Sequence, residues 1–525
     1  MIAQPPKTDQ DKWVYTSCGG CYAQCGIKAH VVDGVVVGLE GNPNTPAGSG
    51  RICAKGTAQL MTLYDRHRVN YPVKRTNPEK GVGVDPKWQR ITWEEALDTI
   101  ISKFRGMKDP RGCYFQATTV QTSEIRFAVP AFMRAWGFKN YWVSGGGLWC
   151  GNGAHFMNGI MHAAWSIIPD WNYNNYTIYF GCSKGHGAGH AALQSAQWAA
   201  DARARGMKAV VFDPFLSTQA SKAHEWVPIR VGTDGAVALG MLNVILNEIG
   251  VWDARYLKLK TNAPYLIQPD GHYIRDPRTK KPMVWDTEDG KAKTFDDKSI
   301  KDYALEGSFN VNGTTCRPSF VLLKEHVKKN YPLDKVERIS SVPAATIRRV
   351  AHEFVEHAQI GSTIMVGGKE LPLRPAAAIF FRGSQGHVNS GWNCLEIDLL
   401  NQVIGASDVP GGAMGHGPPV SHGHPDTGKP DTVPYACPDG MMVVKGWVYD
   451  HKPYPLRDPA PPQRLDLQDM YPCSVYNAFT ICTPEWEKYL KDFKIDYDPE
   501  IMINFGSNSV MTMANAEDVT ENFLK

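Results

Sequence analysis

Four cysteines near the start of the chain, spaced C-x2-C-x3-C-x27-C, constrain its N-terminal fold more than any other feature. Three of them, Cys18, Cys21 and Cys25, fall in one short loop, and Cys53 follows after a longer segment. A cubane [4Fe–4S] cluster needs one soft anionic ligand at each iron, so four thiolates with this spacing predict such a cluster. The alternatives are unligated thiols or a structural zinc site, although zinc sites usually pair their cysteines as C-x2-C twice.

The segment between the third and fourth cysteines has the pattern of a β-hairpin. Hydrophobic residues alternate with polar or exposed positions over 27–31 and again over 35–39. Asp33-Gly34, between the two runs, is a favoured pair for a tight hairpin turn. We therefore expect a hairpin that carries the chain from Cys25 back to Cys53.

Length and composition exclude several classes of protein. A chain of 525 residues is too long for one hydrophobic core and should form about three or four domains. Its net charge of +3 gives no electrostatic case for binding nucleic acid or a membrane surface. The sequence shows no apolar run near the roughly 18 residues of a membrane span, and no hydrophobic signal core at its start. Twelve cysteines without a disulfide framework fit a reducing compartment, so we expect a cytoplasmic protein.

The middle of the chain has the pattern of an α/β fold. An apolar strand over 176–180 leads into a glycine-rich turn at Gly181, and a helix from about 191 to 205 precedes a second strand over 209–212. Strand, helix and strand in this order predict a parallel sheet with a ligand site at the carboxyl ends of its strands.

Further elements extend this pattern. Gly232-Thr233-Asp234 opens another helix, whose N-terminal amides could hold an anion. A helix over 344–357, a strand over 364–366 and a strand over 502–505 are expected later in the chain. The chain is therefore predicted to be α/β.

Together and in this order, the separated motifs resemble the molybdopterin oxidoreductase family, in particular the dimethyl sulfoxide reductase group. The resemblance runs from about Val14 to the end of the chain and rests on the cysteine motif with Lys55-Gly56, the Gly181 turn, Val211-Phe212-Asp213-Pro214 through Thr218, Gly232-Thr233-Asp234-Gly235-Ala236, and Gly506-Ser507-Asn508. It implies two cofactors, the [4Fe–4S] cluster and a bis-molybdopterin guanine dinucleotide that holds molybdenum or tungsten.

The same resemblance assigns cofactor-binding residues. The first pterin dinucleotide would be held by residues of the α/β region: Gly181, Ser183, Asp213, Thr218, Gly232 and Asp234. Gly506 and Asn508 match residues that line the second dinucleotide, and His387 matches a polar loop near the pterins.

Cys150 is the candidate protein ligand of the molybdenum or tungsten. It lies in the glycine-rich segment 144–153, before the first dinucleotide turn, and a soft thiolate suits this metal. A buried inert cysteine is the alternative, with Ser144 as the reserve ligand. His155 could contact substrate or a non-protein ligand of the metal, although a lone histidine is more often structural.

Lys55, two residues after Cys53, matches a lysine that lies between the cluster and the nearer pterin. A cation in that place favours the more negative, reduced cluster. The alternative is a solvated surface lysine.

The resemblance further implies an N-terminal iron–sulfur hairpin module followed by two interleaved, doubly wound, mostly parallel sheet domains. The expected division is 1–65 for the cluster module, 171–364 for the first dinucleotide, and 66–170 with 365–525 for the active site and second dinucleotide. The C-terminal barrel usual in the family is not found, so the chain is expected to be one part of a split enzyme or a truncated sequence.

The function implied is catalytic. Two-electron oxidation, reduction or hydroxylation at the metal would send electrons through the [4Fe–4S] cluster to an iron–sulfur partner subunit, with a membrane anchor or a separate barrel polypeptide as further partners. The stretch 260–266 is similar to members that act on organic substrates, including phenylacetyl-CoA:acceptor oxidoreductases. The alternatives are reduction of an inorganic oxyanion or sulfur compound, and a non-catalytic electron-relay role.

Overall fold

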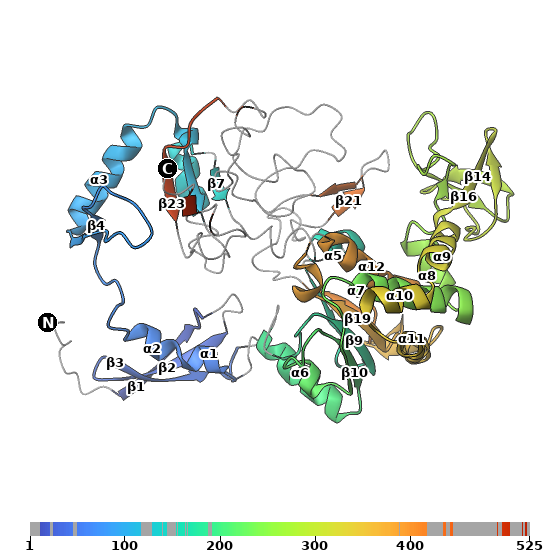
Figure 1. Cartoon of the computed structure of the whole chain (residues 1–525), viewed down its shortest axis with the longest axis horizontal. Helices are drawn as coiled ribbons and strands as arrows, with labels where there is room; N and C mark the ends of the chain where they lie inside the picture. The colour runs from blue at the N-terminus through green and yellow to red at the C-terminus, as the bar shows by residue number, and fades with distance from the viewer. Residues whose placement is uncertain are drawn as a thin grey trace. The chain divides into compact units, whose positions relative to one another are not determined.

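A computed structural model describes most of the chain as two compact units (Figure 1). The first unit comprises Met1–Leu148, Ala191–Gln194 and Asp458–Lys525, and the second comprises Trp149–His190 and Ser195–Arg457. The described residues are 11–20, 25–45, 50–116, 129–138, 140–143, 154, 156–162, 164, 166–186, 192–387, 389–416, 434–436, 442–444, 491, 496–504, 517 and 520–521. The three-part division expected from the sequence stays a prediction.

The first unit begins with a three-stranded antiparallel sheet, β1(Asp11–Ser17), β2(Gly26–Val32) and β3(Val35–Gly41). Asp33 and Gly34 join β2 to β3 with φ angles of 49° and 79°, the left-handed conformation that a two-residue hairpin turn requires. This confirms the predicted hairpin and adds β1, which the sequence did not indicate. Two short helices, α1(Ala54–Thr57) and α2(Gln59–Leu63), follow Cys53.

A parallel three-stranded sheet forms the other part of the first unit. Its order is β23(Ile501–Asn504), β6(Cys113–Gln116) and β7(Asn140–Val143), so a strand from near the chain's end pairs with one from its first quarter. The predicted strand at 502–505 is thereby confirmed. The same unit contains β4(Val73–Arg75), β5(Trp88–Arg90), α3(Trp93–Arg105) and α4(Val129–Trp136).

The second unit is built on a four-stranded parallel sheet. Its order is β11(Glu225–Val227), β10(Lys208–Phe212), β9(Tyr176–Phe180) and β19(Ala376–Phe380). Every residue of β9 and β19 is buried, as continuous apolar strands in a covered parallel sheet should be. The chain adds β10 and β11 on one side of β9 and then β19 on the other, so the strand order reverses between β9 and β19.

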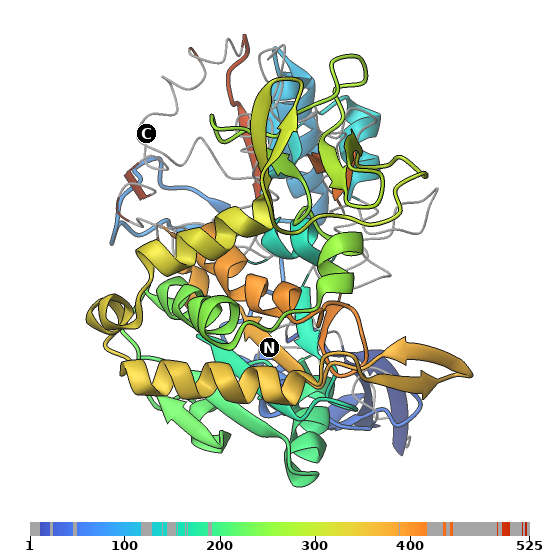
Figure 2. The same cartoon turned by 90° about the vertical axis from the view of Figure 1, so that its right-hand side faces the viewer.

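Helices cover this sheet. The helices α7, α10, α11 and α12 pack together beside it (Figures 1 and 2), and they supply much of one large buried core. The described α-helices that lie wholly or mainly in the second unit are α5(Phe156–His162), α6(Ala192–Ala204), α7(Asp234–Asn243), α8(Ala254–Lys260), α9(Ser319–Asn330), α10(Leu333–Ser340), α11(Ala344–Ala358) and α12(Ser390–Val403). Among them α6, α7 and α11 confirm predicted helices.

One predicted strand is present but lies elsewhere in the topology. The segment predicted at 364–366 is β17(Thr363–Val366), which pairs antiparallel with β18(Lys369–Pro372) as a hairpin outside the parallel sheet. Its residues are exposed or half-buried. The place expected for it is taken by β19, whose sequence Ala-Ala-Ala-Ile-Phe has little β-propensity but fits between layers of helices.

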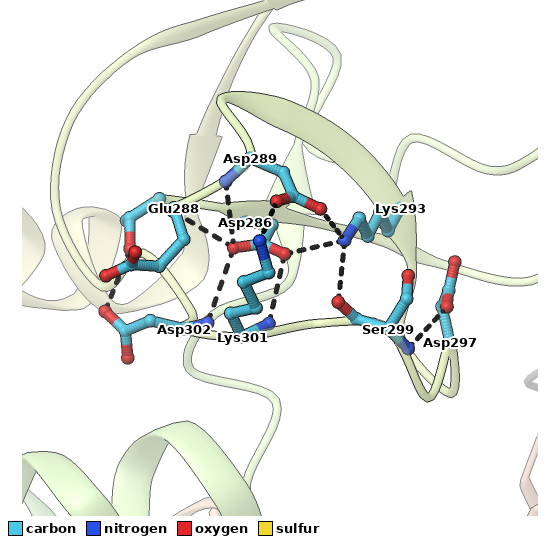
Figure 3. Close-up of polar contacts among 9 residues, drawn as sticks. Asp286, Glu288, Asp289, Lys293, Asp297, Ser299, Lys301 and Asp302 are labelled. Carbon is cyan, nitrogen blue, oxygen red and sulfur yellow. Dashed lines mark hydrogen bonds and ion pairs between the residues drawn. The ribbon is translucent and has the colours of Figure 1, made fainter.

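An insertion between α8 and α9 carries small antiparallel sheets. They are formed by β12(Leu266–Ile267), β13(Met283–Asp286), β14(Lys291–Thr294), β15(Phe309–Val311) and β16(Thr314–Pro318). Figure 3 shows its polar centre, where the Lys293 ammonium lies 2.7 Å from an Asp286 oxygen and 2.9 Å from the Ser299 carbonyl. Burial opposes ionisation of Asp286, but Lys293 and neighbouring amides hold its pKa well below the usual range. This network is internally satisfied and structural.

Two further strand pairs complete the described second unit. The strand β8(Ser166–Pro169) pairs antiparallel with β20(Ala413–His416), and β21(Pro434–Ala436) pairs with β22(Met442–Val444). Among the residues described, none of the helices is both long and apolar enough to cross a bilayer. Location in the cell stays a prediction of the sequence.

Candidate cofactor sites

Three of the four motif cysteines line one pocket of the first unit. Its lining residues are Cys18, Gly20, Cys25, Ile52, Cys53, Lys55 and Gly56. These cysteines form no disulfide. Cys21, the fourth predicted ligand, lies outside the described residues. The pocket therefore has the thiol-rich lining that an iron–sulfur cluster needs.

The hairpin explains why Cys53 lies near Cys25. The Gly26 carbonyl, directly after Cys25, accepts a hydrogen bond of 2.9 Å from the amide of Asn42, directly after β3. A Cβ atom at Gly41 would collide with the backbone at Gly50, so the segment leading to Cys53 passes against the end of β3. The antiparallel pairing of β2 and β3 thus closes the loop between the third and fourth cysteines.

Backbone groups hold Cys18 in the pocket. Its amide donates to the Cys25 carbonyl at 2.9 Å, and the amide of Gly20 donates to its sulfur at 3.4 Å. Amide hydrogen bonds to thiolate sulfur are among the features that set the potential of an iron–sulfur cluster. At Gly56, a Cβ atom would lie 3.5 Å from this sulfur and 2.6 Å from Ile52, so a larger residue would crowd the pocket.

The second group of predicted residues lies at the carboxyl ends of the parallel strands. Gly181 follows β9 with a φ of 50°, and its carbonyl accepts a 2.8 Å hydrogen bond from the amide of Gly383, just after β19. A Cβ atom on Gly181 would lie only 2.8 Å from the Gly383 backbone. This close approach occurs where the strand order reverses, the place at which open parallel sheets bind their ligands.

Two buried carboxylates lie near this edge. Asp213 follows β10 and Asp234 begins α7, and each residue is 5% exposed. Burial raises the pKa of Asp234 to about 6, and the negative charge of Asp213 adds to the rise. No hydrogen bond or ion pair from the described part of the chain reaches the Asp213 carboxylate. Such acceptors fit a ligand rich in N–H or O–H donors.

Asn393, a residue of α12 that the sequence did not indicate, joins the other groups of this site. Its Oδ1 accepts from the Gly235 amide at 3.2 Å, and its Nδ2 lies 2.9 Å from His387 Nε2 and 3.5 Å from Asp234 Oδ2. The His387 ring in turn lies 3.5 Å from where a Gly232 Cβ would be. Gly232, Asp234 and His387 are therefore brought together, although His387 is far from the other two in the sequence.

For the remaining predicted residues the structure shows no contact with the groups described above. Ser183 is half-buried in the Gly181 turn, and Thr218 is exposed in the loop after Asp213. Cys150, His155, Gly506 and Asn508 lie outside the described residues, so their assignments stay predictions.

Two further residues were missed by sequence reasoning. Gln385, in the loop after β19, accepts a short hydrogen bond from the amide of Ala154. Lys184, in the Gly181 turn, is fully buried, and its ammonium donates to Ser166 Oγ at 2.7 Å and to the Ile167 carbonyl. Gln385 lies in the same loop as His387, and Lys184 lies in the Gly181 turn. Their positions within these two predicted motifs are the sequence signal that could have indicated them.

Comparison with known protein families identifies the class. Residues 11–65 match the molybdopterin oxidoreductase Fe4S4 domain, and residues 68–413 match the molybdopterin oxidoreductase domain. The chain belongs to the molybdopterin oxidoreductase family. The family implies a [4Fe–4S] cluster and molybdopterin with molybdenum or tungsten, which favours the cluster over a zinc site in the cysteine pocket.

Individual relatives are similar over most of this chain. A sulfite dehydrogenase polypeptide of Allochromatium vinosum is 29% identical over 94% of this chain and 53% of its own length. The alpha chain of the perchlorate reductase of Dechloromonas aromatica is 26% identical over 82% of this chain and 49% of its own length. The chain thus spans about half the length of these relatives.

The fold also has a solved counterpart. Acetylene hydratase from Pelobacter acetylenicus covers 76% of this chain, with 44% of its own length matched, a TM-score of 0.52 and 23% identity. The predicted fold class, an N-terminal iron–sulfur module followed by mostly parallel α/β domains, is confirmed by this likeness and by the family match.

Proposed function

We propose that this chain is the catalytic subunit of a molybdenum or tungsten bis-pterin oxidoreductase. The observation that carries the proposal is the gathering of Asp213, Gly232, Asp234 and His387 at the carboxyl ends of the parallel strands, where the strand order reverses. When bound, the metal–pterin group supplies the two-electron chemistry, and the chain supplies binding and orientation.

The chain's own residues have distinct parts in this proposal. Asp213 and Asp234 accept hydrogen bonds from the donors of the first dinucleotide, together with Gly181, Ser183 and Thr218. Cys150 binds the metal, His155 contacts the substrate, and Gly506 and Asn508 line the second dinucleotide. These assignments rest on the motif matches and, for the carboxylates, on their buried acceptors.

Electrons leave through the first unit. Cys18, Cys21, Cys25 and Cys53 hold the cluster, and the Lys55 cation favours its reduced state, since Lys55 lines the same pocket as three of these cysteines. A partner protein with its own iron–sulfur cluster then accepts electrons one at a time. Both relatives described above are named as single polypeptides of a larger enzyme, which supports a complex of several chains.

The substrate we propose is a small inorganic oxyanion. The relatives that match most of this chain are named for sulfite and perchlorate, both oxyanions. The organic or aromatic acyl compound favoured by the sequence is not confirmed, and it remains the competing substrate in the test.

The test is cofactor analysis followed by assay of the purified complex. We expect about four iron atoms, one molybdenum or tungsten and two GMP released by hydrolysis per chain. Reduced viologen should be oxidised on addition of a sulfur or chlorine oxyanion, whereas oxidised viologen should not be reduced on addition of an acyl-CoA. Iron without molybdenum, tungsten or GMP would instead identify an electron relay. Sequencing the polypeptides that co-purify identifies the partner.

A further inference from the structure

The side-chain amide of Asn393 is buried in the candidate dinucleotide site, and its neighbours fix its orientation. Its Oδ1 accepts a hydrogen bond from the Gly235 amide at 3.2 Å. Its Nδ2 lies 3.3 Å from the Ser384 carbonyl and 3.5 Å from Asp234 Oδ2. Turning the amide over would place Nδ2 against an N–H group and Oδ1 against two other oxygens. These three contacts therefore determine that Nδ2 is the amide atom that faces His387.

This orientation determines how the His387 ring forms hydrogen bonds. Asn393 Nδ2 is a donor and lies 2.9 Å from His387 Nε2, so Nε2 must accept. On the other side of the ring, the amide of Asn389 points at Nδ1 from 3.2 Å. Both ring nitrogens thus face N–H donors, although a neutral imidazole has only one acceptor nitrogen. The two donors compete for a single lone pair.

Distance and burial favour Asn393 in this competition. Its contact with the ring is the shorter one, and a buried donor without a partner is costly. Asn389 is exposed, so its amide can bond to water instead. The hydrogen of the His387 ring therefore lies on Nδ1. Within the described part of the chain, the atom that contacts Nδ1 is itself a donor and leaves this N–H without an acceptor.

The Nδ1–H group of His387 lies beside the turn that opens α7. His387 Nδ1 is 3.7 Å from the place that a Cβ atom of Gly232 would take. Gly232 and Asp234 are among the residues predicted to bind the first dinucleotide. A half-buried donor without a partner at this place fits an oxygen acceptor of a bound ligand. The pyrophosphate and carbonyl oxygens of a pterin dinucleotide are acceptors of this kind.

We propose that Asn393 is a positioning residue that holds His387 in the tautomer with hydrogen on Nδ1, so that this N–H donates to an oxygen of the first pterin dinucleotide. The inference rests on the proposed function, which supplies the dinucleotide. Asn393 acts through the His387 ring and not by touching the ligand. Gly235 belongs to the same arrangement, because a Cβ atom there would lie 2.5 Å from Asn393 Oδ1 and displace the amide.

The tautomer can be measured directly by NMR of the holoenzyme with its histidines labelled with nitrogen-15. The signals of His387 are those that disappear in His387→Asn. We expect hydrogen on Nδ1 in the parent. In Asn393→Leu we expect it on Nε2, because the Asn389 amide then has no competitor for the lone pair of Nδ1. A parent with its hydrogen on Nε2 would overturn the proposal.

Retention of the dinucleotide tests whether Asn393 acts through His387. On dilution, Asn393→Leu should lose hydrolysable GMP about tenfold faster than the parent, since one hydrogen bond to the ligand is lost. His387→Asn keeps an amide donor close to the place of Nδ1 and should retain its GMP. Adding Asn393→Leu to His387→Asn should then cause no further loss. If the double variant loses GMP as fast as Asn393→Leu alone, or if Asn393→Leu retains it, the proposal is wrong.

Asn401→Leu is the matched control on the same helix. Asn401 is fully buried, and its amide bonds to both the N–H and the carbonyl of Ala378 at 2.8 Å. Both leucine variants leave a buried backbone amide unpaired, so both should lower the thermal unfolding midpoint. Only Asn393→Leu should change the tautomer and the loss of GMP, and equal loss in Asn401→Leu would reduce the effect to stability. A parent without GMP contradicts the proposed function instead, and the tautomer still decides the role of Asn393.

Discussion

At the scale of single residues, the candidate dinucleotide site is marked by charges that are costly to bury. Asp213 and Asp234 are nearly inaccessible, and Lys184 in the neighbouring Gly181 turn is completely so. Within the described residues no carboxylate pairs with Lys184; its ammonium has only neutral acceptors and the Phe381 ring at 4.8 Å. Buried ionisable side chains with shifted pKa values cluster at functional sites of proteins.

Lys184 leads to a prediction about pH. Burial lowers its pKa from 10.5 to about 8, so the unfolded chain binds more protons between these values and folding stability should rise with pH there. Lys184→Met removes this dependence. The free energy of unfolding of Lys184→Met should exceed that of the parent by most at neutral pH. This difference should shrink by about 3 kcal/mol at high pH, where the parent's lysine is neutral in both the folded and the unfolded chain. Urea unfolding of both proteins across this range measures the difference, and a gain that does not vary with pH contradicts the prediction.

At the scale of elements, the ends of β9 and β19 determine the geometry of the site. The amide of Gly383 reaches the Gly181 carbonyl only because neither residue has a side chain at the point of contact. The two glycines therefore let two loops from distant parts of the sequence converge at the edge of the sheet.

Gly181→Ala should disrupt this convergence. The left-handed conformation costs alanine about 1–2 kcal/mol, and its Cβ would meet the Gly383 backbone at 2.8 Å. We expect a lower thermal unfolding midpoint and loss of most of the GMP released per chain. Gly250→Ala is the matched control, since Gly250 has a φ of 72° but no atom within 4 Å of the added Cβ. If Gly181→Ala retains its GMP, the β9–β19 contact does not shape the dinucleotide site.

At the scale of the whole molecule, the two candidate cofactor sites belong to different compact units. The cysteine pocket is built by the first unit, and the strand-end site by the second. Gly506 and Asn508, which we propose for the second dinucleotide, also belong to the first unit, but none of the strand-end residues of the second unit lines the cysteine pocket. Loss of the cluster alone should therefore leave the strand-end site loaded.

Cys53→Ala tests this independence. Removing one of four thiolate ligands should reduce iron and acid-labile sulfide from about four per chain to near zero. Molybdenum or tungsten and GMP should stay at the parent level. Cys316→Ala, which removes a buried thiol in the insertion of the second unit, should change none of these quantities. Parallel loss of GMP in Cys53→Ala would show that the sites depend on one another.

The sequence alone predicted the elements whose signals are local. The Asp33-Gly34 hairpin, the strands β9 and β10 and the helix α7 follow from turn chemistry and hydrophobic runs, and the structure has them close to the predicted bounds. The cysteine spacing likewise predicted the cluster pocket. The alanine-rich β19 escaped detection, because its strand character comes from burial between layers and not from its residues.

What the sequence determined by itself was therefore the family, the fold class and the residue types of both sites. Only the tertiary structure showed that β19 pairs with β9 on the side away from β10. It also showed that Asn393 contacts Asp234, Gly235 and His387. The physical reason is that these relations depend on contacts between segments far apart in the chain, for which local propensity and spacing carry no signal.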